Sequence, residues 1–383
     1  MKVYLDNAAT TPLDPKVLEA MLPYMTDHFG NPSSSHAFGR KTKTAIENSR
    51  RLVAKWLNCQ PSEIYFTSGG TEADNLAIRV AVKDLGCTHL ITSPIEHSAV
   101  IKTMQYMADK HHVKLSLVKL TPNGHVDLED LEKLLAENPK SFVSFMHGNN
   151  EIGNILPLKE VGELCKKYGA YFHSDTVQTM CHFPFNMQEV NLHFAAAAAH
   201  KFHGPKGIGF LYVNRTVRFN AGIIGGGQER GMRGGTENLY GIVGLAKAVD
   251  IAMSEVEEHK EYILGLKKYM IRELESNVPG VAFNGDSKSD SSLYTVLNVT
   301  FPPNPNADML LFLLDLDGIA ASGGSACSSG ASKGSHVLEA IHALIPGCAS
   351  IRFSFSRMTT KEQIDYTIEK IKVLCNVSQS VTA

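Results

Sequence analysis

The sequence predicts an α/β protein, with a large domain built on a mainly parallel sheet and a smaller α+β domain. Up to about residue 240, short apolar runs alternate with amphipathic helical segments. That order is typical of β-α-β units, whose parallel strands are covered by helices on both faces. After about residue 240 the alternation gives way to a long charged helix and fewer crossovers. The length of 383 residues allows two or three domains.

The elements of the large domain follow one another in strand and helix order. Residues 63–67 form a short apolar run, and a helix fits 73–83 with its apolar positions on one face. A second helix fits 157–168, because Pro157 lies near its first turn and Gly169 follows its end. Further short strands are predicted at 89–92, 142–146 and 170–173.

The part after residue 240 has a different pattern. One long helix with dense charge fits 241–276. The shorter elements predicted after it are strand 294–299, helix 307–316, strand 350–355 and helix 361–375. We therefore expect a large domain over 16–250 and a small domain formed by 1–15 and 251–383.

Composition excludes several classes of function. Lys plus Arg is 37 and Asp plus Glu is 39, which gives a formal charge of −2 and no electrostatic reason to bind nucleic acid or an anionic membrane. No apolar run approaches the roughly 20 residues that span a bilayer, and the first residues lack a secretory signal. The seven cysteines include no C-x-x-C pair, which argues against a disulfide framework or a zinc site. We expect a cytoplasmic protein without a bound metal.

A basic, glycine-rich turn over 200–209 lies between two apolar stretches and contains Lys201. Such a turn is often only a solvated loop, since short Lys and Gly motifs are weak signals. The alternative is a lysine that forms a Schiff base with a carbonyl cofactor, beside groups that hold the cofactor's phosphate.

Three other features lie where strands end. Asp175 follows a predicted parallel strand, where open α/β sheets bind ligands; it suits either a helix N-cap or a cationic partner such as a pyridinium nitrogen. The turn over 68–72 leads from a strand into a helix, whose free N–H groups would bind phosphate. His97 follows strand 89–92, and it is either a structural histidine or a site residue.

Cys327 differs from the other cysteines in its surroundings. It lies in a long Gly/Ser stretch over 322–330, a composition that predicts an exposed, mobile loop. An exposed thiol of this kind can reach a substrate, whereas a buried thiol cannot. Cys327 is thus either a nucleophile or an ordinary surface cysteine.

Taken together, these pieces resemble the cysteine desulfurases, pyridoxal-phosphate enzymes of the class V aminotransferase group. The resemblance covers nearly the whole chain, and the Ser-Ala-Cys loop with its Gly/Ser flanks is similar to that of the NifS/IscS-type branch. It implies the fold type I of pyridoxal-phosphate-dependent transferases. The motifs that carry it are 4–12, 30–34, 71–72, 96–97, 149–153, 173–178, 200–201, 204–207, 230–236 and 325–327.

The resemblance also implies roles for individual residues. Lys201 would form the Schiff base, Asp175 would pair with the pyridinium nitrogen, and His97 would stack on the ring and move protons. Arg352 would anchor the substrate carboxylate through its bidentate fork, and Cys327 would accept the sulfur. The remaining cofactor contacts that it implies are Gly70 and Thr71, Asn150 beside cofactor and substrate, Gln178 on the phenolic oxygen, His200 on the phosphate, and Thr236 from a second subunit.

One position departs from the family pattern. The family usually has Ser-x-His-Lys, with the serine hydroxyl on the phosphate, whereas this chain has Ala198 within the alanine run 195–199. One hydrogen bond to a charged group is worth about 1.5–3 kcal/mol, so we expect cofactor affinity about 10–100-fold lower than with serine. The groups that carry the chemistry are retained.

The resemblance implies a homodimer that takes sulfur from L-cysteine, releases L-alanine and leaves a persulfide on Cys327. The persulfide would pass to an acceptor protein, such as an Fe–S scaffold, or to a thiolation pathway. Two alternatives stay open: a selenocysteine lyase or other β-eliminating enzyme, and a catalytically weakened sulfur-transfer scaffold. Cys327 favours sulfur transfer over elimination, because simple β-elimination needs no protein thiol.

Overall fold

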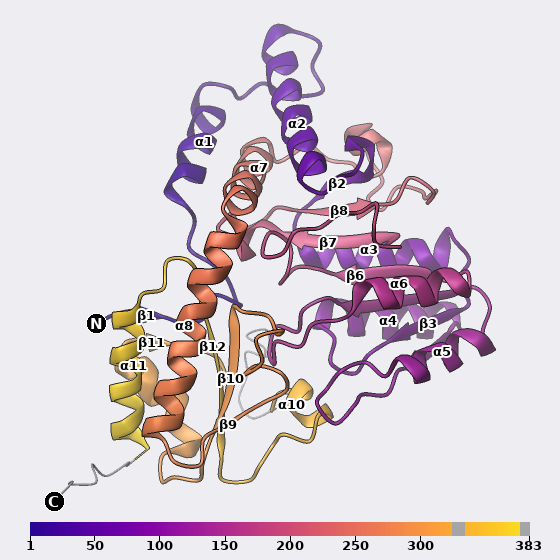
Figure 1. Cartoon of the computed structure of the whole chain (residues 1–383). Helices are drawn as coiled ribbons and strands as arrows, with labels where there is room; N and C mark the ends of the chain where they lie inside the picture. The colour runs from indigo at the N-terminus through magenta and orange to yellow at the C-terminus, as the bar shows by residue number, and fades with distance from the viewer. Residues whose placement is uncertain (324–333, 376–383) are drawn as a thin grey trace, which may run out of the picture.

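The structure is a computed structural model that describes residues 1–323 and 334–375 (Figure 1). It contains a seven-stranded sheet, a three-stranded sheet and a pair of short strands. Helices cover the large sheet on both sides, and two long helices run along the small one. The α/β class predicted from the sequence is confirmed.

The large sheet is mainly parallel. In spatial order its strands are β2 (Ile64–Thr67), β8 (Gly209–Val213), β7 (Phe194–Ala198), β6 (Tyr171–Asp175), β5 (Ser141–Met146), β3 (His89–Thr92) and β4 (Lys114–Leu117). Parallel pairing runs without interruption from β4 to β7. Only β8 runs against its neighbours, β7 and β2.

The register of the central strands brings their carboxyl ends to one edge. Met146 of β5 pairs with Asp175 of β6, and Asp175 pairs with Ala196 of β7. All three strands therefore end beside one another, at the edge where open parallel sheets bind ligands. The sequence prediction that Asp175 ends a parallel strand is confirmed.

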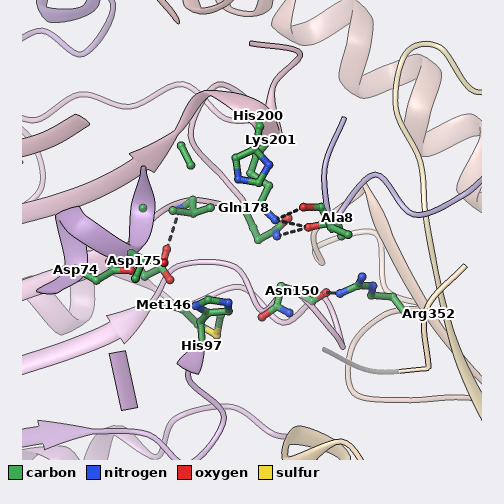
Figure 2. A pocket seen from close by; sticks show the side chains of 15 residues that line it. Ala8, Asp74, His97, Met146, Asn150, Asp175, Gln178, His200, Lys201 and Arg352 are labelled. Atoms are coloured by element: carbon green, nitrogen blue, oxygen red, sulfur yellow. Dashed lines mark hydrogen bonds between the residues drawn. The ribbon is translucent and has the colours of Figure 1, made fainter. Parts of the chain in front are cut away.

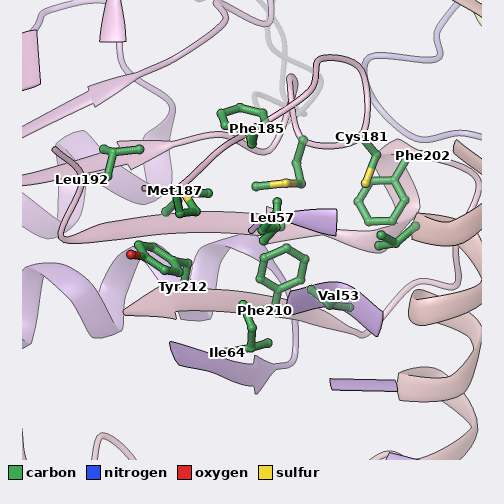
Figure 3. Close-up of a cluster of buried hydrophobic side chains, with 14 of the residues drawn as sticks. Val53, Leu57, Ile64, Cys181, Phe185, Met187, Leu192, Phe202, Phe210 and Tyr212 are labelled. Atoms are coloured by element: carbon green, nitrogen blue, oxygen red, sulfur yellow. The ribbon is translucent and has the colours of Figure 1, made fainter. Parts of the chain in front are cut away.

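Two layers of helix bury the large sheet. The helices of this part are α1 (Pro15–Thr26), α2 (Ala37–Trp56), α3 (Gly70–Lys83), α4 (Ser98–His111), α5 (Leu128–Glu137), α6 (Leu158–Lys167) and α7 (Leu239–Ser254). Side chains of α3 and α4 pack on one face, and those of α2, α5, α6 and α7 pack on the other. Figure 3 shows part of the second core, where Phe210 and Tyr212 of β8 meet Val53 and Leu57 of α2 and its C-cap.

The alanine run lies in the centre of this packing. Alternate side chains of a strand point to opposite faces. Ala195 and Ala197 accordingly belong to the core under α2 and α7, and Ala196 belongs to the core under α3 and α4. All three are fully buried, and the small side chain of Ala196 lets α3 pack closely on β7.

The second part of the chain surrounds the small sheet. Its strands are β9 (Ala282–Phe283), β10 (Val296–Phe301) and β12 (Ala349–Ser354), all antiparallel, while β1 (Val3–Tyr4) pairs in parallel with β11 (Ile319–Ala320). Its helices are α8 (Val256–Asn277), α9 (Leu310–Leu316), α10 (His336–Ala340) and α11 (Lys361–Leu374). Leu5 near the N-terminus packs in the same core as Met270, Phe353 and Ile368. The domain limits 16–250 and 251–383 stay a prediction.

The single helix predicted over 241–276 is wrong in one respect, because the chain forms two helices there. Glu255, with φ −120° and ψ 19°, separates α7 from α8. The two helices serve different cores: α7 packs under the large sheet, and α8 packs on the small one. A break is needed because one straight helix cannot follow both surfaces. In the described part of the chain, no helix is long and apolar enough to cross a membrane.

Buried histidines make stability depend on pH. Burial lowers the pKa of six of them to about 4 or below: His89, His147, His173, His182, His200 and His203. Between about pH 6.5 and pH 4 the unfolded chain binds protons at these positions and the folded chain does not, so folding stability falls as pH falls. The raised pKa values of Asp74, Glu96 and Asp175 act in the opposite direction but involve fewer groups.

We therefore expect the thermal unfolding midpoint of the protein to drop steadily between pH 6.5 and pH 4.5, the window set by these lowered pKa values. Circular dichroism at a series of pH values measures it. The variant His89→Gln, which removes one such group, should show a shallower dependence. A midpoint that stays constant or rises on acidification would contradict the account.

Candidate active site

A cavity of about 200 Å³ lies at the carboxyl ends of β5, β6 and β7 (Figure 2). Strand ends, helix starts and the N-terminal segment all contribute to its wall. Nine residues predicted from the sequence as site residues line it: Gly70, Thr71, His97, Asn150, Asp175, Gln178, His200, Lys201 and Arg352. Residues from distant parts of the sequence therefore meet in one place.

Lys201 enters the cavity from the short 3-10 helix η2 (Ala199–Lys201), which directly follows β7. Its Nζ donates hydrogen bonds to the backbone carbonyls of Ala8 at 2.6 Å and Ala9 at 2.9 Å. The N-terminal segment thus holds the amine inside the cavity. Lys206, the other lysine of this turn, is not among the residues that line the cavity in the described part of the chain.

Asp175 lies opposite Lys201 and is only 5% exposed. Its Oδ1 accepts a hydrogen bond from the backbone N–H of Val177 at 2.9 Å. Burial raises the pKa of this carboxyl, while His97, the Val177 N–H and Lys201 oppose the rise. A buried carboxylate of this kind gains from a further cationic partner inside the cavity. The residues after Asp175 form a turn, so the helix N-cap alternative does not hold.

His97 is a structural N-cap that also borders the cavity. It is the N-cap of α4, where its Nδ1 accepts a hydrogen bond from the Ala99 N–H at 3.2 Å, and its ring also lines the cavity. Burial lowers its pKa, so the ring is neutral near pH 7. Because Nδ1 is an acceptor, the neutral ring carries its proton on Nε2 and can donate there.

The first turn of α3 forms the end of the cavity that suits an anion. Gly69 has a φ of 155°, and a Cβ on Gly70 would come within 2.6 Å of Val177 Cγ2, so only a bare backbone fits. Thr71 is the next residue of α3. The free N–H groups at the N-terminus of this helix can donate hydrogen bonds to an anion. Ala198 closes this end with its methyl group, which would lie 3.8 Å from a Cβ placed on Gly70.

His200 and Gln178 complete the polar wall. His200 Nδ1 lies 3.1 Å from Thr10 Oγ1, and burial, helped by Lys201 and Lys206, lowers its pKa to about 4. Gln178 donates from Nε2 to the Ala8 carbonyl at 2.9 Å. Both side chains are therefore oriented by the N-terminal segment, and both are neutral donors or acceptors near pH 7.

Arg352 lies in the middle of β12 and brings a cation to the opposite side of the cavity. It is 1% exposed, and its Nη1 donates to the Asn150 carbonyl at 2.9 Å. Its Nη2 donates to Asp6 Oδ1 at 2.8 Å. Its Nε is buried and has no hydrogen-bond partner among the described residues. A guanidinium with spare donors beside a cavity can bind a carboxylate.

Sequence reasoning missed two acidic residues at this site. Asp74 lines the cavity, and its Oδ1 lies 3.4 Å from His173 Nε2. Burial, with the nearby charges of Asp175 and Glu96, raises the pKa of Asp74 well above its usual value. Its position three residues after Thr71 on a helix was the available signal. Asp6 is the second missed residue, and its position within the 4–12 motif was the only sequence signal for it.

Thr236 and Cys327 do not join these residues in the described chain. Thr236 lies in a separate hollow beside Ser68 and Arg233, so within one chain it does not line the cavity. Cys327 lies outside the described residues.

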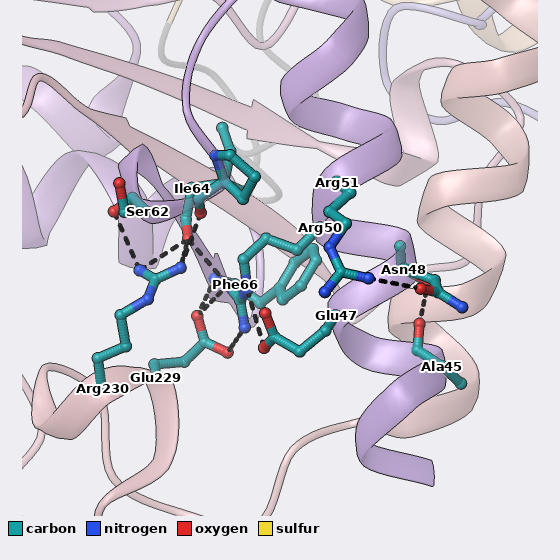
Figure 4. Close-up of polar contacts among 12 residues, drawn as sticks. Ala45, Glu47, Asn48, Arg50, Arg51, Ser62, Ile64, Phe66, Glu229 and Arg230 are labelled. Carbon is teal, nitrogen blue, oxygen red and sulfur yellow. Dashed lines mark hydrogen bonds and ion pairs between the residues drawn. The ribbon is translucent and has the colours of Figure 1, made fainter. Parts of the chain in front are cut away.

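The loop before Thr236 is held by a buried ion pair (Figure 4). Arg50 of α2 donates from Nη1 and Nη2 to the carboxylate of Glu229, at 2.8 and 2.7 Å. The Phe66 N–H donates to the same carboxylate at 2.9 Å. Glu229 and Arg230 both have positive φ, which is unfavourable for residues other than glycine. The bidentate ion pair holds the backbone in this conformation. Arg233 extends the anchoring to Glu72 in the first turn of α3.

The fold and site place the chain in a known family. Residues 3–367 match the aminotransferase class-V family, and the chain belongs to it. A solved NifS-like protein, 37% identical, superposes with a TM-score of 0.90 over 98% of this chain and all of the other.

Within that class the similarity is to cysteine desulfurases. The chain is 42% identical over 374 residues to cysteine desulfurase IscS of Dictyoglomus turgidum, covering 97% of this chain and 94% of the relative. A solved structure of SspA in complex with cysteine is 32% identical, with a TM-score of 0.80 over 94% of this chain and all of the other. The chain is therefore a member of the cysteine desulfurase family.

The crowding around Gly70 gives a test of the cavity wall. Gly70→Ala should destabilise the fold by about 1–3 kcal/mol, because the added Cβ would clash with the rigid, β-branched Val177. Gly265→Ala is the matched control: it lies in α8 with nothing within 4 Å of a Cβ, and it should stabilise by about 0.5–1 kcal/mol. Urea unfolding measures both. Equal effects of the two substitutions would mean that the clash is absent.

Proposed function

We propose that this chain is a pyridoxal-phosphate-dependent cysteine desulfurase that takes sulfur from L-cysteine, releases L-alanine and holds the sulfur as a persulfide on Cys327. One observation carries the proposal: the Lys201 amine, the Asp175 carboxyl and the Arg352 guanidinium all border the same cavity. An amine, an acid and a carboxylate anchor are the three groups that such chemistry needs around one substrate.

The residues present fit the cofactor. Asp175 is a buried carboxyl with a raised pKa, which suits a cationic ring nitrogen as partner. The bare backbone at Gly70 and the N–H groups of the first turn of α3 suit a phosphate. Lys201 would attach the carbonyl carbon, Gln178 would bind the ring oxygen, and His97 would stack on the ring. When bound, pyridoxal phosphate supplies an electron sink that stabilises negative charge at the substrate's Cα.

The chain's own side chains then have separate tasks. Arg352 binds the substrate carboxylate through its unused N–H donors, and the carbonyl of Asn150 fixes the guanidinium in place. The Lys201 amine takes the proton from Cα. His97, whose Nδ1 accepts from the Ala99 N–H, would turn its Nε2–H toward the substrate side of the cavity and move protons there.

Cys327 completes the reaction. Its thiolate attacks the substrate's sulfur, a bond forms between the two sulfur atoms, and the Cβ–S bond breaks. The electron pair of that bond stays with the carbon skeleton, which is protonated and leaves as L-alanine. The sulfur remains as a persulfide for a sulfur-acceptor protein. A β-eliminating enzyme would need no such thiol, and a non-catalytic scaffold would need no lysine in the cavity.

A homodimer accounts for the place of Thr236. The buried Arg50–Glu229 pair holds its loop firmly, although the loop does not reach the cavity of its own chain. Apolar side chains are also exposed on α1, before and at the start of α2, in the loop before Thr236 and at the start of α7, namely Leu18, Leu22, Met25, Phe29, Phe38, Ile224 and Tyr240. We infer that a second copy covers this surface and receives Thr236 at its cavity. A cytoplasmic location and the identity of the sulfur acceptor stay predictions from the sequence.

The lysine assignment is tested by Lys201→Ala. Visible absorbance of the bound cofactor should disappear, and sulfide release from L-cysteine should fall by roughly 10³-fold or more, because no other amine lines the described cavity. Lys206→Ala, on the same turn, is the control and should retain both. The reverse result would assign the cofactor amine to Lys206.

The departure at position 198 is tested by Ala198→Ser. The new hydroxyl lies at the anion end of the cavity and should raise pyridoxal-phosphate affinity about 10–100-fold. Fluorescence titration of the apoprotein measures it. Cys165→Ser is the control, because it also introduces a buried serine hydroxyl but lies in the core between α6 and the sheet. It should lower the stability of the fold without raising cofactor affinity. An unchanged affinity in Ala198→Ser would mean that backbone N–H groups already saturate the phosphate.

The nucleophile is tested by Cys327→Ala. The protein should still bind pyridoxal phosphate and L-cysteine, because Lys201, Asp175 and Gln178 are intact, while sulfide release should fall by roughly 10²-fold or more. Cys348→Ala is the control and should keep full turnover. Alkylation of the persulfide and mass spectrometry locate the sulfur. A label on Cys348, or full turnover in Cys327→Ala, would favour the β-elimination alternative.

A further inference from the structure

The carboxylate anchor already has a carboxylate of its own. Arg352 Nη2 donates to Asp6 Oδ1 at 2.8 Å, and the two side chains are 1% and 18% exposed. Asp6 is not among the residues that line the cavity in the described chain, whereas Arg352 is. The Asp6 carboxylate therefore acts on the cavity through Arg352.

The position of Asp6 is set by three contacts. Its Oδ1 accepts a second hydrogen bond, from Ser322 Oγ at 2.8 Å. Ser322 in turn exchanges two backbone hydrogen bonds with Arg352, at 2.7 and 3.2 Å. The backbone of Asp6 bridges Ser354, two residues further along β12. The carboxylate is thus fixed to the same strand as the guanidinium it faces.

This pair decides the charge that a ligand meets. A buried guanidinium without a counter-ion costs several kcal/mol and would attract any small anion. With Asp6 beside it, Arg352 presents N–H donors but almost no net charge. A second carboxylate gains those hydrogen bonds and is repelled by Asp6, so a ligand that carries its own ammonium group has the advantage over a simple anion.

We propose that Asp6 is a specificity-determining positioning residue: it aims Arg352 at the cavity and, as its counter-ion, restricts the anchor to the carboxylate of zwitterionic α-amino acids. The inference rests on the proposed role of Arg352 as carboxylate anchor. It assigns to the N-terminal segment a function in substrate selection, in addition to its carbonyl contacts with Lys201.

The test is Asp6→Asn in the holoenzyme, since asparagine keeps the oxygen that Arg352 and Ser322 donate to and removes only the charge. We expect KM for L-cysteine to fall about tenfold with kcat within about twofold, because the repulsion at the shared guanidinium is lost. Sulfate, used as a simple-anion probe, should inhibit the variant at least about tenfold more strongly than the parent. An unchanged or raised KM, or unchanged sulfate inhibition, overturns the proposal.

Two controls separate charge from geometry. Ser322→Ala removes the other hydrogen bond to Asp6 Oδ1 and keeps the charge, so KM should not fall as it does in Asp6→Asn. Asp14→Asn removes a carboxylate from the neighbouring Arg357, an ion pair outside the cavity, and should leave KM unchanged. If either control lowers KM as Asp6→Asn does, the effect is not due to the counter-ion and the proposal fails.

Failure of the anchor itself gives a different result. Arg352→Lys loses the fork and should raise KM for L-cysteine by about tenfold or more. If Arg352→Lys leaves KM unchanged, the anchor assignment is wrong and this inference falls with it, while the Lys201 assignment stands. If Asp6→Asn does not fold, the parent enzyme decides: its KM should rise less than about twofold between about 0.05 and about 0.5 M sodium chloride, and a steep rise would reveal a bare cation.

Discussion

The site depends on the in-register parallel pairing of β5, β6 and β7. This pairing places Met146, Asp175 and Ala196 side by side, so the three strands end together and leave a hollow beyond their carboxyl ends. The β7 strand then turns at once into η2 and brings Lys201 to face Asp175. A shift of one residue in any of these strands would turn Asp175 or the alanines to the other face, because side chains alternate along a strand.

The N-terminal segment is the second constraint, since it closes the hollow from the opposite side. The carbonyl of Ala8 accepts hydrogen bonds from both Lys201 and Gln178, and Thr10 lies against His200. The same segment pairs with β11 and contributes Asp6 to Arg352. A few residues therefore orient the amine, the amide, the imidazole and the guanidinium at once. These contacts explain why the polar groups of the cavity are held firmly although they come from distant elements.

Much of this arrangement was predictable from local pattern. The alternation of strands and helices indicated the parallel sheet, the turn chemistry around Pro157 and Gly169 indicated α6, and the strand-end rule placed Asp175 correctly. The long helix over 241–276 was not predicted correctly, because its break at Glu255 reflects packing on two cores and has no Pro or Gly signal. Asp6 and Asp74 escaped notice because an isolated aspartate carries no information about its neighbours in space.

The sequence by itself determined the class of fold through its periodicity, and the resemblance of its ordered motifs to a known family pointed to nine residues of the cavity. Only the tertiary structure decided how the charges are balanced. Asp6 and Arg352 are separated by most of the chain, and their pairing arises from the bridge between the N-terminal segment and β12. Likewise burial raises the pKa of Asp74 and lowers that of His97. Burial and long-range pairing are properties of the packed core, and no local pattern encodes them.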